Sequence, residues 1–125
     1  MHITGHGRAA FHEAFEAVVG QPPGDDVPFA GYTDHQIALA MLAKVGHADA
    51  AHVPRMLAEL GAALAAKAEQ IRAEGRALPG AREALEALAG RDGVVSSLLT
   101  GNIEANAAVK LAAFDLDRLV DLELR

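Results

Sequence analysis

A polar turn, Thr100-Gly101-Asn102, carries the residue types best suited to binding an anion. It follows an uncharged run at residues 94–99 and precedes a helix expected to start near Ile103. The threonine hydroxyl, the backbone N–H groups of Gly101 and Asn102, and the positive end of the helix dipole can face one spot, where phosphate is the obvious ligand. We therefore predict phosphate binding by these three residues. Helix capping by Thr100 and Asn102, with Gly101 only making the turn, is the alternative that the residues alone favour.

The remaining polar residues form no comparable site in the sequence. The six histidines include no His-Glu-x-x-His pair, and Gly5 and Gly7 disfavour the helix that His2 and His6 would need to share a metal. The chain has no cysteine, which excludes disulfides, thiolate nucleophiles and cysteine-based zinc sites. No Gly-x-Ser-x-Gly turn is present, so a serine hydrolase is not expected. The carboxylate pair in the Pro/Gly loop at residues 25–26 is expected to face solvent.

These residues would be positioned by several helices followed by a mixed region. Apolar residues at helical spacing, with glycine or proline near the ends, predict the helices, and an uncharged run that is β-branched at its start predicts a buried strand. The fold class predicted from this order is α/β, with part of a doubly wound parallel sheet after residue 77. The expected elements are helices over 8–19, 34–45, 54–74, 81–89 and 103–114, and strands over 94–99 and 120–124.

The composition is that of a globular chain with an acidic surface. Its 125 residues are 51% hydrophobic, and the formal net charge is −6. An acidic chain binds a phosphate backbone poorly, so nucleic acid is not an expected partner. No apolar run approaches the roughly 20 residues of a membrane span, and the N-terminus has no signal-peptide pattern. We therefore expect a cytoplasmic location and no membrane partner.

Five stretches, in order along essentially the whole chain, carry a family resemblance. They are Arg8-Ala9-Ala10-Phe11, Phe29-Ala30-Gly31-Tyr32-Thr33-Asp34, Leu78-Pro79-Gly80, the run from Val94 to Asn102, and Lys110-Leu111-Ala112-Ala113-Phe114. The series resembles the haloacid dehalogenase-like (HAD) hydrolase superfamily in its phosphoglycolate phosphatase-like branch. The run ending in Thr100 resembles the second motif of that family, whose hydroxyl binds the transferring phosphoryl group.

The resemblance implies a helical cap over residues 1–77 and part of the α/β core over residues 78–125. It implies that Thr100 is the catalytic residue that contacts phosphate, with Gly101 and Asn102 adding backbone N–H groups. In the cap, Thr33 and Asp34 are the candidate substrate-facing residues, with helix capping as the open alternative. The intact relative would hydrolyse a small phosphate monoester with Mg²⁺, so a small phosphorylated metabolite is the implied ligand.

The nucleophile and metal motifs of that family are missing from the chain. The family's Asp-x-Asp-Gly-Thr motif would precede Met1, and its third-motif lysine and Mg²⁺-binding carboxylates would follow Arg125. We therefore expect an inactive fragment, with no Mg²⁺ bound by its own residues. Asp115 and Asp117 have the nucleophile spacing, but they follow a helix and are expected to form a helix-ending turn. Lys110 is expected to be a solvated helix lysine.

A non-enzymatic helical protein-interaction module is the alternative function. Alanine-rich helices and an acidic surface suit such a module, whereas a strand ending in Thr100 does not. Phosphate affinity near Thr100 would separate the two interpretations. If a central strand of the sheet is missing, the strand at residues 94–99 has an unpaired edge, which invites self-association. We therefore expect a homodimer through this exposed sheet edge, or a poorly soluble chain.

Overall fold

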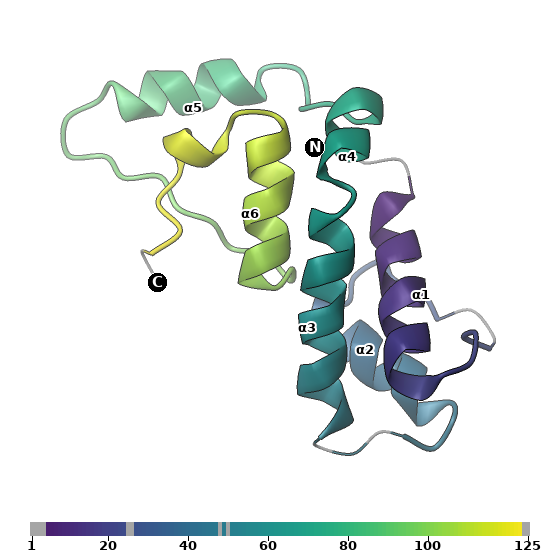
Figure 1. Ribbon diagram of the computed structural model, residues 1–125. Helices are drawn as coiled ribbons and strands as arrows, with labels where there is room; N and C mark the ends of the chain where they lie inside the picture. Colours follow the sequence, from purple (N-terminus) through teal and green to yellow (C-terminus); the bar gives the residue numbers. More distant parts are fainter. Residues whose placement is uncertain (1–4, 25–26, 48, 50, 124–125) are drawn as a thin grey trace.

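The computed structural model describes residues 5–24, 27–47, 49 and 51–123, and this part of the chain is helical (Figure 1). The helices expected from the sequence are present, with shifted ends and with the long third helix interrupted after Ala65. The elements are α1 (His6–Val19), α2 (Asp34–Ala43), α3 (His52–Ala65), α4 (Ala68–Glu74), α5 (Ala81–Ala89), α6 (Glu104–Ala113) and the 3-10 helix η1 (Asp117–Leu119).

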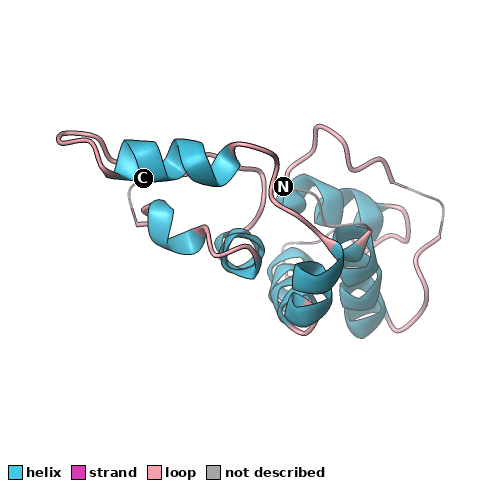
Figure 2. Ribbon diagram, turned by 90° about the horizontal axis from the view of Figure 1, so that it is seen from above, coloured by secondary structure: helices cyan, strands magenta, loops and turns pink. Residues whose placement is uncertain are grey.

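The predicted α/β fold is wrong for the described residues, which contain no β-sheet. Figure 2 shows only helices and loops, and Arg76 is an isolated bridge residue. Residues 94–100 form neither helix nor strand. Among the described residues, one backbone hydrogen bond joins them to the C-terminal segment, donated by Asp121 N to Ser96 O at 2.7 Å. A single bond is not a ladder, and a buried parallel strand needs neighbouring strands that the helical remainder of the chain does not supply.

The second predicted strand, over residues 120–124, is also not formed in its described part. Residues 120–123 form neither helix nor strand, η1 ends just before them, and residue 124 lies outside the described residues. The helical architecture conflicts with the doubly wound core of a HAD-type hydrolase. The assignment of residues 78–125 to such a core, and of the chain to that hydrolase class, is therefore corrected.

The core lies among α1, α2, α3 and α4. Phe11 and Phe15 fall on one face of α1 at a spacing of four residues, as the periodicity predicts, and both are buried. α1 packs along α3, and α2 packs against both helices (Figure 1). Among the described residues, the largest fully buried side chains are Phe15, Leu42, Met56, Leu60, Leu64 and Ile71.

The C-terminal elements differ in how they meet this core. α6 packs against α3 and α4, and Ala113 at its end belongs to the core cluster. α5 lies to one side of the bundle (Figure 2) and contacts η1. The apolar spacing of Leu85 and Leu88 predicts a buried face for this helix, but α5 has no buried residue. In the described part of the chain, no helix has both the length and the apolar character needed to cross a bilayer.

Candidate functional site

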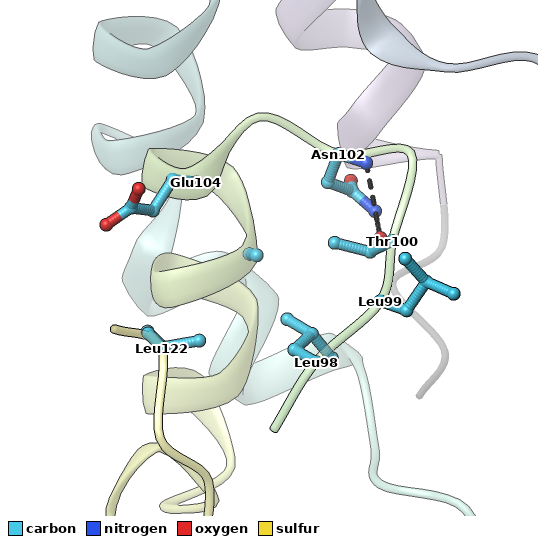
Figure 3. Close-up of a pocket in the computed structure, with 7 residues that line it drawn as sticks. Leu98, Leu99, Thr100, Asn102, Glu104 and Leu122 are labelled. Atoms are coloured by element: carbon cyan, nitrogen blue, oxygen red, sulfur yellow. Dashed lines mark hydrogen bonds between the residues drawn. The ribbon is translucent and has the colours of Figure 1, made fainter. Parts of the chain in front are cut away.

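The predicted phosphate-binding turn forms a compact hydrogen-bonded unit immediately before α6. The hydroxyl of Thr100 accepts two hydrogen bonds from Asn102, one from the backbone N at 3.2 Å and one from the side-chain Nδ2 at 2.7 Å (Figure 3). The N-cap residue of α6 is Ile103, and no side chain within the turn caps the helix. The turn therefore does not act as the simple helix cap that the residues alone favoured.

The structure brings the two predicted sets of site residues into direct contact. Asp34 N donates to Gly101 O at 2.8 Å, and Asp34 Oδ2 accepts from Ile103 N at 2.7 Å. A Cβ built on Gly101 would lie 3.0 Å from Thr33 Cα, so the two backbones approach closely. The segment that begins α2 and the turn that begins α6 thus form one interface, which we call the α2–α6 junction: Thr33, Asp34, Thr100, Gly101, Asn102, Ile103 and Lys110.

Thr33 has the capping role that the sequence left open for it. Its hydroxyl accepts from Gln36 N at 3.2 Å, and Gln36 Oε1 accepts from Thr33 N at 2.8 Å, which completes a capping box at the start of α2. Asp34 is the first residue of that helix, and its carboxylate turns toward α6 rather than toward solvent. It is 7% exposed. Asp34 therefore supplies the start of α6 with the acceptor that the turn itself lacks.

Lys110 is a member of the junction that the sequence interpretation missed. It was expected to be solvated, but it is partly buried and its Nζ donates to Asn102 Oδ1. Ala107 and Ala113, three residues before and after Lys110, are both buried. This spacing places Lys110 on the inner face of α6, which the burial of the two alanines shows and the sequence alone does not.

The two charged groups of the junction have shifted pKa values. Burial raises the pKa of the Asp34 carboxyl, against the opposing effects of the Ile103 N–H and the charge of Lys110. Burial lowers the pKa of Lys110, and the charge of Asp34 opposes this. Each group loses hydration when the junction closes, and each offsets part of that cost for the other.

The raised pKa of Asp34 predicts how one substitution changes the dependence of stability on pH. A carboxyl that holds its proton more tightly when folded stabilises the fold below its unfolded pKa of 3.8, and this contribution is lost as the pH rises through the folded pKa. Asp34→Asn keeps an acceptor for Ile103 N and does not titrate. Urea unfolding is expected to show the stability of the variant, relative to the native chain, rising between about pH 3.8 and neutral pH. A relative stability that falls over this range would contradict burial as the dominant effect.

A pocket of about 370 Å³ opens beside Thr100 (Figure 3). Leu98 points toward α6, whereas Leu99 points away from the helix. Glu104 is the charged member of the lining. The lining residues are Leu98, Leu99, Thr100, Asn102, Glu104, Ala107 and Leu122.

The groups around Thr100 include a hydroxyl donor, which favours an anion, and carboxylates, which disfavour one. The hydroxyl can still donate its own proton, since both of its hydrogen bonds from Asn102 use the oxygen as acceptor. However, the N–H of Ile103 is taken by the Asp34 carboxylate, and a second carboxylate, Glu104, lines the pocket. The chain's own carboxylates thus stand where a helix N-terminus would favour a phosphate. Phosphate binding at Thr100, Gly101 and Asn102, with Thr33 and Asp34 facing a substrate, stays a prediction.

Asp115 ends α6, as predicted, and is not placed for nucleophilic chemistry. It follows the helix with a φ of 56°, the one described non-glycine residue in the left-handed region. Arg82 Nη2 donates to the carbonyl oxygens of Phe114 at 2.6 Å and Asp115 at 3.1 Å, and the Asp115 carboxylate pairs with Arg72 at 2.8 Å. The helix-ending turn is therefore confirmed for Asp115, whereas Asp117 begins η1.

Metal-binding side chains do not cluster in the part of the chain that the structure describes. No group of three or more histidine, aspartate or glutamate side chains there could hold a metal ion. His6 Nε2 instead contacts Glu74 Oε2 at 2.6 Å. His2 and the carboxylates at residues 25–26 lie outside the described residues. The Mg²⁺ implied by the family resemblance stays a prediction for an intact relative.

Neither a protein-family model nor a curated protein matches this sequence.

Proposed function

We propose that this chain is a non-enzymatic protein-interaction module that binds an extended polypeptide strand along residues 94–99. The observation that carries the proposal is the exposure of two neighbouring pairs of apolar side chains, which Ser96 and Ser97 separate. Val95 is 64% exposed and Leu99 is fully exposed, and Val94 and Leu98 are also exposed. Contiguous exposed apolar residues in a folded chain mark interaction surfaces.

An extended strand is the occupant that suits this segment. The segment runs without helical turns from the end of α5 toward α6 (Figure 1). Leu98 and Leu99 point to opposite sides (Figure 3), which is the alternation of a β-strand. One side of the segment already meets Asp121 through Ser96 O. A partner strand on the other side would pair with backbone groups, and its side chains would cover the apolar ones, as in β-strand addition.

Burial of these apolar side chains would stabilise the complex with a partner strand. Full burial of one valine or leucine side chain is worth about 1.5–3 kcal/mol, before the cost of ordering the partner. The strand that the sequence predicted would have argued against a purely helical module. That objection no longer applies, since residues 94–100 form no sheet with the rest of the described chain. We include a cytoplasmic location in the proposal, with which a cysteine-free chain is compatible.

The test is a titration of the ¹⁵N-labelled chain, followed by amide NMR, with two separate probes. The first probe is a six-residue peptide of alternating valine and threonine, and the second is inorganic phosphate. The peptide is expected to shift the amides of residues 94–99, and phosphate is expected to leave Thr100 and Asn102 unchanged. Phosphate shifts at Thr100 and Asn102, without any peptide effect, would favour anion binding instead.

A matched pair of variants identifies the surface. Leu99→Asn is expected to weaken peptide binding by at least tenfold, whereas Leu39→Asn, at an exposed leucine on α2, is expected to leave it unchanged. Equal weakening by the two variants would show that the peptide is attracted to apolar surface in general.

A further inference from the structure

The pocket beside Thr100 is lined by groups of three chemical kinds. Thr100 contributes a hydroxyl whose own proton is not used in its two hydrogen bonds. Leu98, Ala107 and Leu122 contribute apolar surface. Glu104 contributes a carboxylate, and it lies with Leu122 on the other side of α6 from Thr100 in the view of Figure 3. A ligand that spans the pocket therefore meets a donor, then apolar surface, then a negative charge.

We propose that this pocket receives a lysine side chain of the polypeptide that binds residues 94–99. The inference rests on the proposed function and names a residue that the partner carries. A lysine residue has the complementary groups in the same order: a backbone carbonyl that accepts, an aliphatic stem, and a positively charged ammonium that donates. Its carbonyl would accept from the Thr100 hydroxyl, its stem would lie over Ala107, and its ammonium would reach Glu104.

The size of the pocket suits one long side chain rather than a larger ligand. Its volume of about 370 Å³ is near the lower end of the range for ligand sites. Ala107 carries only a methyl group, so the surface of α6 between Leu98 and Leu122 has space for an unbranched stem. A lysine can bury its stem against these apolar groups and keep its ammonium in contact with water, which limits the cost of desolvating the charge.

The charges around the pocket favour a cation over an anion. Residues 78–123 contain eight acidic and four basic side chains, so this region has a formal net charge of −4. Two of its basic side chains are engaged elsewhere. Lys110 donates to Asn102 and lies near the charge of Asp34, and Arg82 donates to two carbonyl oxygens at the end of α6. The field of this region therefore attracts a cationic side chain and repels a carboxylate.

Three hexapeptides test the assignment by amide NMR titration of the full chain. All three have the alternating valine–threonine sequence, in which the central threonine is kept, replaced by norleucine, or replaced by lysine. Norleucine has the unbranched stem of lysine without the ammonium, so these two peptides isolate the effect of the charge. At about 10 mM salt the lysine peptide is expected to bind about threefold to fivefold more tightly than the norleucine peptide. It is also expected to shift the amides of Ala107 and Leu122, and its advantage is expected to shrink at about 150 mM salt.

A matched pair of variants locates the charge effect. Glu104→Gln keeps the length of the side chain and removes its charge, so the lysine and norleucine peptides are expected to bind it equally. Glu16→Gln removes the same charge from an exposed position on α1 and is expected to keep the preference for lysine. Because Glu104 lies in the first turn of α6, circular dichroism and an unchanged affinity for the norleucine peptide check that Glu104→Gln keeps the fold.

The possible results separate this inference from the proposed function. Equal binding of the lysine and norleucine peptides to the native chain, with both shifting residues 94–99, would overturn the lysine pocket and leave the proposed function standing. A preference that Glu16→Gln reduces as much as Glu104→Gln does would reflect the net charge of the chain, and it would also overturn the pocket. If none of the three peptides shifts residues 94–99, the proposed function is overturned and the lysine pocket with it.

Discussion

Replacing Leu60 by alanine is expected to lower the free energy of unfolding by about 2–5 kcal/mol. Leu60 lies on α3 and is 1% exposed, in the cluster where α1, α2 and α3 meet. The substitution removes buried methyl groups and leaves a cavity in the core cluster, to which α1, α2, α3 and α4 all contribute side chains. Urea unfolding followed by far-ultraviolet circular dichroism measures the change, since the chain has no tryptophan to report it.

Leu99→Ala is the matched control, because the chemical change is the same at the opposite extreme of burial. Leu99 is 101% exposed, so the substitution is expected to change the free energy of unfolding by less than about 0.5 kcal/mol at a concentration where the chain is monomeric. If the two variants lost similar stability, the apolar segment at residues 94–99 would be part of a folded core. The interaction surface proposed for it would then be wrong.

Much of the helical part of the fold follows from short-range patterns. Phe11 and Phe15 share a face of α1, and Thr33 with Gln36 forms a capping box that fixes the start of α2. These signals act within one or two turns, so they can be read without knowing what the helix packs against. The ends of the helices differ from the predicted ends. The interruption between Ala65 and Ala68 divides what the sequence shows as one continuous apolar stripe.

The strands could not be predicted in the same way, because a strand is formed by its neighbours. Residues 94–99 have the β-branched, uncharged character of a buried strand, but this character describes the environment that the segment would suit. Among the described residues, one backbone hydrogen bond, from Asp121 N to Ser96 O, and one side-chain hydrogen bond, from Ser97 Oγ to Asp121 O, join the two segments that were expected to be strands. The same apolar character, without a sheet to bury it, becomes the exposed surface on which the proposed function rests.

The α2–α6 junction lies between these two cases. The Thr100–Asn102 turn was singled out by residue type, and Thr33 and Asp34 by the family resemblance, although more than 60 residues separate the two groups in the chain. Their mutual contact depends on how α6 packs on α3 and α4, which no local pattern contains. Lys110 was missed for a related reason. A lysine in a helix is normally solvated, and only the burial of Ala107 and Ala113 places this one on the inner face.

Replacing Gly101 by alanine is expected to destabilise the chain by about 1–3 kcal/mol, because the junction leaves no room for a side chain at this position. A Cβ there would lie 3.0 Å from Thr33 Cα and 3.3 Å from Thr33 Cγ2, so backbone would have to move. That movement would lengthen the bond from Asp34 N to Gly101 O and draw Ile103 N away from the Asp34 carboxylate. The loss is therefore expected to exceed the strain of one contact and to loosen the start of α6.

Gly61→Ala makes the same substitution with the opposite expected sign. Gly61 lies inside α3, and a Cβ there would meet Ala105 Cβ at 3.7 Å and Ile103 Cδ1 at 3.9 Å, which are ordinary contacts. Alanine in a helix interior is favoured over glycine, so a gain of about 0.4–1 kcal/mol is expected. Urea unfolding of both variants beside the native chain gives the two signs. A Gly101→Ala variant as stable as Gly61→Ala would mean that Thr33 and Gly101 do not approach as described. The Asp34 carboxylate would then not be held at the start of α6. It would no longer compete with phosphate at the site predicted at Thr100.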